Sequence, residues 1–227
     1  MHGELKKLEG PRLPGAAEHR GFDGCAPSDF RSVFCEAISA LEQLQVPYVL
    51  IGGLASALLG RPRCSADVDL LVRPRDAGRA LEALAAAGFD TEETNPHWLY
   101  KGTKRGVLVD VLFKGPNDIY LDDEMMTRSR VVTLMGHRVR VVPPEDLLVM
   151  KALVHDEETP RHWHDALGLV AAGGLDWDYL VRRARKGNRR TLSLLLYALS
   201  IDLAVPRRAI DALHAQSFQE GDVDAEQ

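Results

Sequence analysis

Two aspartates one residue apart, Asp67 and Asp69, are the residues of this sequence best placed to do chemistry. Side chains at positions i and i+2 of a strand point to the same face, so these carboxylates would converge while Val68 turns into the core. Carboxylates held this close repel each other unless a cation lies between them. Together with the preceding glycine pair, Gly52-Gly53, the pattern indicates metal-assisted phosphoryl or nucleotidyl transfer.

The glycine pair alone is a weaker signal. Glycines between a strand and a helix let backbone N–H groups approach a phosphate, and the helix N-terminus adds its positive end. A tight turn also needs glycine, and without Asp67 and Asp69 downstream the turn would be the preferred interpretation.

A third carboxylate, Asp110, interrupts the apolar run Val107 to Phe113. In a strand with one solvated face, polar and apolar residues would alternate along the sequence, and they do not alternate in this run. Burying an unpaired carboxylate costs several kcal/mol, so the charge must be paired, coordinated to metal or displayed at a cleft. One alternative is a salt bridge to Lys101 or Arg105. Beside the pair of acids at 67 and 69, metal binding is the favoured interpretation.

The elements that must position these acids follow from the apolar periodicity. Apolar residues at intervals of three and four predict a helix from Phe30 to Leu44, with Ser28 as its N-cap. The other elements before residue 143 are predicted as strands at 48–51, 68–72, 98–101, 107–113, 131–134 and 139–142 and helices at 54–59 and 74–85.

After Pro143-Pro144 the pattern becomes helical only, with helices predicted at about 145–156, 161–172, 176–186, 190–203 and 207–216. The fold class is therefore α/β: a mixed β-sheet core with flanking helices, followed by a C-terminal helical bundle. The predicted organisation is a flexible arm at 1–27, an α/β domain at 28–143, a helical domain at 144–218 and a flexible tail at 219–227.

Composition narrows the function classes. The 227 residues are 45% hydrophobic with a formal net charge of −5, which excludes a protein that coats nucleic acid through overall basicity. A local basic run between residues 182 and 190 is either a solvated helix end or a phosphate-binding patch for RNA. The three cysteines, Cys25, Cys35 and Cys64, have no CxxC spacing and leave an odd one out, which favours a reducing cytoplasm. We also predict no membrane span, because no apolar run is long enough to cross a bilayer.

The segment from Ile51 to Leu70, with Asp110 as third acid, resembles the nucleotidyltransferase superfamily whose best-known member is DNA polymerase beta. That superfamily carries a glycine pair after its first strand, an Asp-x-Asp motif about a dozen residues on, and a third acid on a later strand. The pattern Arg63-x-Ser65-x-Asp67-x-Asp69 is similar in particular to the AbiEii-like toxins of bacterial toxin–antitoxin pairs. Antibiotic nucleotidyltransferases share much of it.

This resemblance implies an enzyme that transfers a nucleoside monophosphate from an NTP and releases pyrophosphate. It makes residues 28–143 the catalytic domain. Two Mg²⁺ ions would be held by Asp67, Asp69 and Asp110. The residues expected to contact the phosphates of the NTP are Gly52, Gly53, Ser56, Arg63 and Ser65.

Lys151 interrupts an apolar helix and admits two interpretations. Its stem can lie on the core while its amine reaches water, which is the ordinary arrangement of such a lysine. The resemblance favours a second one, in which Lys151 reaches the triphosphate and Asp165, on the next helix, orients Lys151 or the nucleotide.

The acceptor is left open between two classes of enzyme. A toxin-like enzyme would modify a tRNA or a protein hydroxyl and would have a cognate antitoxin, whereas a resistance enzyme would modify an aminoglycoside or lincosamide antibiotic. A third possibility is a degenerate, non-catalytic module that binds nucleotides or a partner, although retention of all three acids argues against it.

Overall fold

The computed structural model describes residues 28–156 and 158–219. Within them a mixed sheet of seven strands has the order β3-β4-β5-β2-β1-β7-β6. The pairs β2–β5 and β1–β7 are parallel, and the other neighbours are antiparallel. The strands are β1 (Tyr48–Leu50), β2 (Asp67–Val72), β3 (Asp90–Asn95), β4 (Leu99–Lys104), β5 (Val107–Leu112), β6 (Arg130–Leu134) and β7 (His137–Val141).

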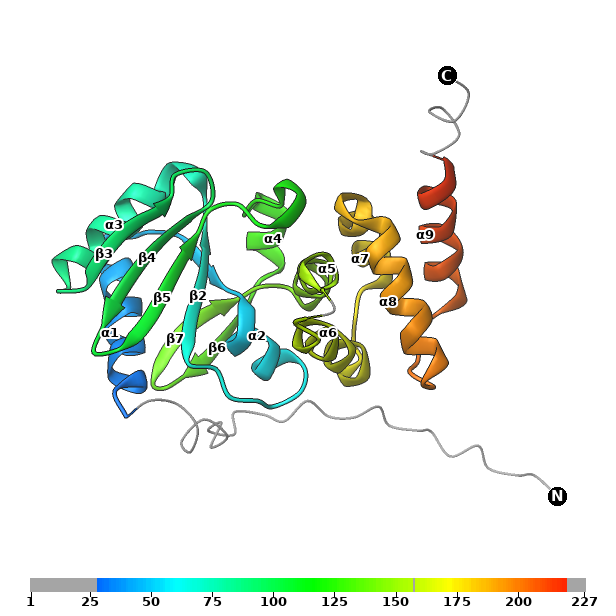
Figure 1. Cartoon of the computed structure of the whole chain (residues 1–227), viewed down its shortest axis with the longest axis horizontal. Helices are drawn as coiled ribbons and strands as arrows, with labels where there is room; N and C mark the ends of the chain where they lie inside the picture. The colour runs from blue at the N-terminus through cyan, green and yellow to red at the C-terminus, as the bar shows by residue number, and fades with distance from the viewer. Residues whose placement is uncertain (1–27, 157, 220–227) are drawn as a thin grey trace.

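Helices cover the sheet and extend away from one of its sides (Figure 1). Helices α1 and α3 contact each other and both contact β5, while α2 lies beside β2 and α5. The helices are α1 (Phe30–Gln43), α2 (Gly52–Leu59), α3 (Ala77–Ala86), α4 (Asp123–Arg128), α5 (Pro144–Val154), α6 (Arg161–Ala172), α7 (Trp177–Arg183), α8 (Asn188–Ser200) and α9 (Arg207–Gln219). Short 3-10 turns are η2 (Pro74–Asp76), η3 (Pro116–Asp118) and η4 (Ala184–Lys186).

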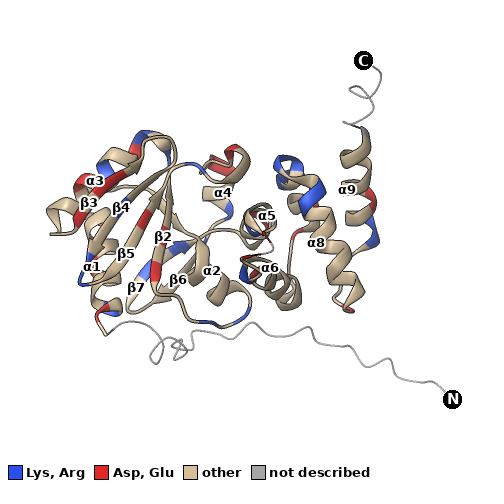
Figure 2. Cartoon of the chain, in the orientation of Figure 1, with Lys and Arg blue, Asp and Glu red and all other residues tan. Residues whose placement is uncertain are grey.

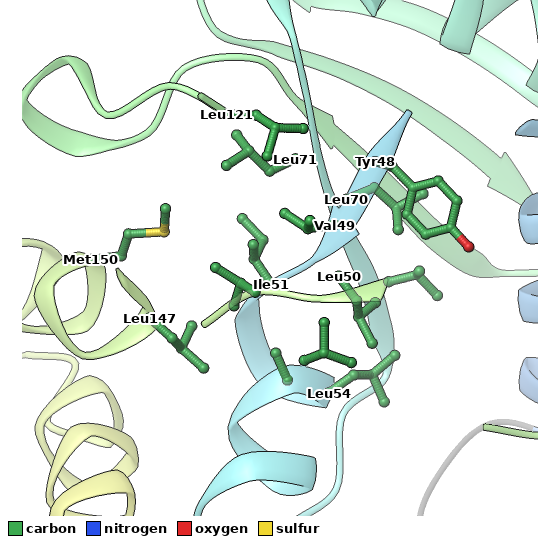
Figure 3. Packing of buried hydrophobic residues seen from close by; sticks show 14 of the residues in the cluster. Tyr48, Val49, Leu50, Ile51, Leu54, Leu70, Leu71, Leu121, Leu147 and Met150 are labelled. Carbon is green, nitrogen blue, oxygen red and sulfur yellow. The ribbon is translucent and has the colours of Figure 1, made fainter. Parts of the chain in front are cut away.

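The helix α5 joins the helical part of the chain to the sheet. Nearly all of its residues are buried, and it contacts α2, α6, α7 and α8. Figure 3 shows Leu147 and Met150 of α5 in the same apolar cluster as Ile51 and Leu121. The shared core fixes the orientation of the helices that follow the sheet.

The α/β fold with a mixed sheet and C-terminal helices is as predicted. The strands end at Val141 and α5 begins at Pro144, where the sequence pattern changes. The division into two domains stays a prediction. The arm predicted at 1–27 lies outside the described residues, as does nearly all of the tail predicted at 219–227.

Several local predictions were wrong. The strand β3 was missed because its sequence, Asp90 to Asn95, has no alternating apolar residues, and none of its side chains is buried. The six-residue helix α4 was also missed, although Asp122 caps it by accepting from the Met125 N–H at 2.7 Å. Ser28 does not cap α1; the N-cap position is Asp29. Strand β4 runs through Gly102 to Lys104, so the hairpin turn is shorter than predicted.

Candidate active site

The glycine pair lies at the start of α2, directly against Asp69. Gly52 has φ +63°, a left-handed conformation, and a Cβ added there would lie 1.8 Å from Asp69 Oδ2. The Gly53 N–H donates to the same oxygen at 3.3 Å. The strand β1 therefore ends in a turn that only glycine fits, and the first turn of α2 faces a carboxylate.

We expect Gly52→Ala to be more destabilising than Gly106→Ala. Both glycines have positive φ, but an added Cβ at Gly106, in the β4–β5 turn, meets no heavy atom within 4 Å. Left-handed backbone costs a non-glycine residue about 1–2 kcal/mol at either position. Displacing Asp69 adds about 1–3 kcal/mol at Gly52 alone. Urea unfolding measures both variants, and equal losses of unfolding free energy would contradict the close approach.

The three predicted acids lie on neighbouring strands. Asp69 of β2 is the direct register partner of Asp110 of β5 in a parallel pair, so both side chains point to the same face of the sheet. Asp67 lies two residues before Asp69 and shares that face. Figure 2 shows acidic segments, in red, on these adjacent strands. The fold thus gathers three carboxylates that are up to 43 residues apart in sequence.

Asp69 and Asp110 are in an environment that disfavours their negative charge. Burial raises the pKa of Asp69 to about 6, and Asp67 and Asp110 add to the rise, opposed by the Gly53 N–H. Burial also raises the pKa of Asp110, with Lys101 opposing it. Asp110 Oδ1 is buried without a hydrogen bond, since Lys101 Nζ lies 3.9 Å away, within ion-pair range but too far to donate. Lys101, and the charge of Lys151 acting on Asp69, offset these negative charges only in part.

We expect Asp69→Asn to raise the free energy of unfolding of the metal-free protein above pH 6. Folding raises the pKa of Asp69 from its ordinary 3.8 to about 6, so on raising the pH the unfolded chain loses this proton first. Wild-type stability therefore falls between about pH 4 and pH 6 and stays lower above, by about 3 kcal/mol. Asparagine removes the ionisation and keeps an oxygen for the Gly53 N–H.

Urea denaturation of both proteins with a chelator, at about pH 4 and about pH 7.5, measures this difference. The two proteins should converge at the acidic value. A gain of the same size at both pH values would show that packing, rather than ionisation of Asp69, separates them.

The donor set fits a hard divalent cation. Carboxylate oxygens are the ligands that Mg²⁺ prefers, and Asp110 Oδ1 is a buried acceptor without a donor. Two other oxygens are engaged within the protein: Ser65 Oγ donates to Asp67 Oδ1 at 2.7 Å, and Asp69 Oδ2 accepts from Gly53. Accordingly, no three acidic, histidine or cysteine side chains among residues 28–156 and 158–219 are already gathered around a single metal position. Binding an ion requires these side chains to turn.

The loop before β2 packs on the glycine pair. A Cβ added at Gly53 would lie 2.2 Å from Ser65 Oγ and 2.8 Å from Arg63 Nη2. Arg63 and Ser65 therefore lie beside the start of α2, where the sequence placed them. Ser56 is different: it is fully buried, and its hydroxyl donates to the Gly52 carbonyl at 2.8 Å. Its contact with a phosphate stays a prediction that requires the side chain to leave this bond.

Asp165 joins the loop to the helical part of the chain. Its carboxylate accepts from Arg63 Nη2 at 3.1 Å, with Arg63 Nε 2.9 Å from the other oxygen, and it lies 3.0 Å from Lys151 Nζ. Burial opposes ionisation of Asp165, but Lys151 and Arg63 together hold its pKa below the ordinary value. The amine of Lys151 does not reach water, because its side chain is only 6% exposed; that of Asp165 is 3% exposed.

Two residues near the site carried no prediction as site residues. His162 Nδ1 lies 3.5 Å from Lys151 Nζ, and burial lowers the pKa of His162, with the charges of Lys151 and Arg161 adding to the effect. Lys101 faces Asp110 as the register partner on β4, the contact considered from sequence as the alternative to metal binding. Arg105 pairs with Glu36 instead. No sequence signal marked His162, since its relation to Lys151 depends on how α6 crosses α5.

A family model described as "Uncharacterised nucleotidyltransferase" matches residues 34–209, which is most of the chain and includes both strands of acids and Asp165. The chain belongs to this nucleotidyltransferase family. It is an enzyme of the nucleotidyltransferase class, and the assignment to the wider superfamily made from the glycine pair and the acids is confirmed. No curated protein sequence matches the chain.

Several solved structures of nucleotidyltransferases are similar to this chain, at low sequence identity. An antigenic nucleotidyltransferase-like protein from Paracoccidioides brasiliensis has 16% identity and a TM-score of 0.49, over 83% of this chain and 94% of that one. A lincomycin-bound lincosamide antibiotic adenylyltransferase has 15% identity and a TM-score of 0.47, over 63% and 97%. The antibiotic-resistance factor ANT(2'')-Ia has 14% identity and a TM-score of 0.41, over 85% of each chain.

Likeness at this level says nothing about the acceptor. The class of reaction is inferred from the family match, and the arrangement of the side chains comes from the structure. Among the helices of the described ranges, none is both long and apolar enough to span a bilayer.

Proposed function

We propose that this nucleotidyltransferase moves a nucleoside monophosphate from an NTP to a hydroxyl group of a tRNA or protein, in a Mg²⁺-dependent reaction in the cytoplasm. The observation that carries the proposal is the face shared by Asp67, Asp69 and Asp110, which places three carboxylates beside a glycine turn. Among the described residues, one cation, Lys101, is ion-paired with them. An NTP with its magnesium ions supplies both the charge and the phosphates that such a site can bind.

In this proposal the three carboxylates hold two Mg²⁺ ions. Bound Mg²⁺ supplies charge neutralisation of the phosphates and alignment of the attacking and leaving oxygens. Asp110, with a buried oxygen lacking a hydrogen-bond donor, would take the proton of the acceptor hydroxyl. The raised pKa of Asp110 strengthens it as a proton acceptor at neutral pH, because a weakly basic carboxylate would release the proton too readily.

The residues around α2 are assigned to the triphosphate. The N–H groups of Gly52 and Gly53 open the helix, whose N-terminus favours negative charge. Arg63 and Ser65 lie against that turn and are within reach of the same phosphates. Lys151 and Arg63 both bind Asp165, which fixes their cationic groups about one carboxylate and limits the conformational entropy lost when a triphosphate binds.

The toxin-like branch is the favoured assignment because the segment Arg63-Cys64-Ser65-Ala66-Asp67-Val68-Asp69 resembles it. This branch implies a cognate antitoxin as partner. An aminoglycoside or lincosamide acceptor is the competing assignment, and the test below separates the two.

The test incubates the purified protein with each labelled NTP and Mg²⁺, in parallel with total cell RNA, cell protein, an aminoglycoside and a lincosamide. The proposal expects label in RNA or protein with stoichiometric release of pyrophosphate. Label transferred only to an antibiotic would assign the enzyme to the resistance class. If no acceptor is labelled and no pyrophosphate forms with any NTP, the proposed reaction is wrong.

A further inference from the structure

A pocket of about 350 Å³ lies where the loop after β5 approaches the end of α7, and the proposed mechanism does not use it. The loop contributes one wall, α5 contributes the floor, and the segment after α7 contributes the other wall. Charged and aromatic side chains dominate its lining, which includes Tyr120, Asp122, Asp146, Arg183, Arg185 and Lys186.

The acidic residues of this pocket are paired with basic side chains within the protein. Asp146 is buried and accepts hydrogen bonds from Arg183 Nε and from the Tyr179 hydroxyl. Arg183 also pairs with Asp122. Asp118, at the rim, pairs with Lys114 at 2.5 Å. Because Arg183 is shared by two carboxylates, these pairs leave about one negative charge unbalanced at the pocket.

Two of its cations make no ion pair among the described residues, although Lys186 lies close enough to Asp118 to help lower the pKa of that carboxyl. Arg185 and Lys186 are exposed and make no ion pair with any residue of the described ranges. Arg182 beside them is paired with Glu124 at 3.0 Å. Figure 2 shows basic segments, in blue, gathered at the end of α7 and α8 nearest α4. The pocket thus carries surplus positive charge in a protein whose formal net charge is −5.

The wall that carries these cations is held in place by the opposite loop. Asn117 Nδ2 donates to the Lys186 carbonyl at 2.7 Å, joining residues 69 positions apart. Asn117 and the following Asp118 both have positive φ, 49° and 57°, an uncommon conformation that turns the loop toward the 184–186 segment. Tyr120, three residues after Asn117, is 41% exposed at the pocket. The geometry is preformed rather than dependent on a ligand.

We propose that this pocket binds a single-stranded segment of an RNA acceptor, with Arg185 and Lys186 on its phosphates and Tyr120 stacked against a base. Unpaired cations beside an exposed aromatic ring are the combination that binds single-stranded nucleic acid. An acidic peptide would use the cations but not the ring. The inference rests on the proposed nucleotidyl transfer and narrows its acceptor from tRNA or protein to RNA.

One helix, α5, carries residues of both the pocket and the candidate active site. Asp146 of the pocket and Lys151 of the site lie five residues apart on α5, about 7.5 Å along the helix axis. Five residues turn a helix by about 500°, so the two side chains leave α5 on different sides, and an RNA strand held at Arg185 and Lys186 would pass around α5 to reach the three carboxylates.

The experiment measures fluorescence anisotropy of a labelled single-stranded RNA of about ten nucleotides with the full chain, without NTP or metal. The double variant Arg185→Gln, Lys186→Gln should bind about tenfold more weakly or worse. The slope of log affinity against log salt should become less negative by about 1.4, because two phosphate contacts are lost. The matched control, Arg207→Gln with Arg208→Gln, removes the same charge from the exposed start of α9 and should bind like wild type.

Substitutions of Tyr120 distinguish binding of RNA from binding of other polyanions. Tyr120→Ala should weaken binding at least about fivefold, and Tyr120→Phe, which keeps the ring, should not. Equal losses in the pocket variant and the control would overturn the proposal, as would wild-type binding by Tyr120→Ala or displacement of the RNA by polyglutamate of matched charge. Because NTP is absent, a failed transfer reaction leaves these binding results intact, and the two proposals fail separately.

Discussion

Replacing Asp67 and Asp69 with asparagine is expected to lower the rate of nucleotidyl transfer by at least about 10³-fold. Asparagine keeps the shape of each side chain but removes the two negative charges that would hold Mg²⁺, and metal contributes several kcal/mol to such reactions. The rate is measured as release of pyrophosphate with saturating NTP and with whichever acceptor the labelling test under "Proposed function" identifies.

The protein should stay folded, since the substitution removes repulsion between half-buried acids rather than a packing contact. A control with Asp90→Asn and Asp178→Asn removes two exposed carboxylates far from the glycine turn and should keep wild-type activity. If the site variant retains more than about a tenth of the wild-type rate, the carboxylates do not hold the catalytic metal.

Replacing Asp165 with alanine is expected to destabilise the protein by about 3–5 kcal/mol. The change leaves Lys151, with a side chain 6% exposed, as a buried cation without its carboxylate, and it also releases Arg63. It should raise the KM for NTP as well, because Arg63 and Lys151 would no longer be held at the turn that faces the phosphates. Urea denaturation and initial-rate kinetics measure the two effects.

A second substitution distinguishes lost charge pairing from lost packing. Lys151→Met in the Asp165→Ala background removes the uncompensated cation and should recover part of the unfolding free energy, although activity should not return. If the double variant is no more stable than Asp165→Ala alone, the pairing of Lys151 with Asp165 contributes little, and the loss comes from the cavity.

The sequence was most informative where a chemical pattern coincided with a structural period. Asp67 and Asp69 could be placed on one face because a strand alternates, and Asp110 drew attention because its neighbours are apolar. That Asp69 and Asp110 are direct register partners could not be predicted, since the pairing of β2 with β5 depends on the hairpin between them. Gly52 was informative only together with Asp67 and Asp69, because glycine is needed both for an ordinary tight turn and for a close approach to a carboxylate.

The contacts between distant segments were the least predictable. Asp165 was expected to orient Lys151 or the nucleotide, but its bond to Arg63 spans 102 residues and depends on how α6 packs beside α2. His162 was missed for the same reason. The edge strand β3 was missed because edge position and exposure remove the apolar signal that marks a strand.

The bond between Arg63 and Asp165 has a consequence during synthesis of the protein. Translation delivers the three carboxylates first, by residue 110, whereas Lys151 and Asp165 leave the ribosome later. A nascent chain that has emerged only as far as the sheet has acids that repel one another and lacks the lysine and its partner. Under the proposed roles, such a chain cannot hold an NTP, so the enzyme stays inactive until its helices have emerged and folded.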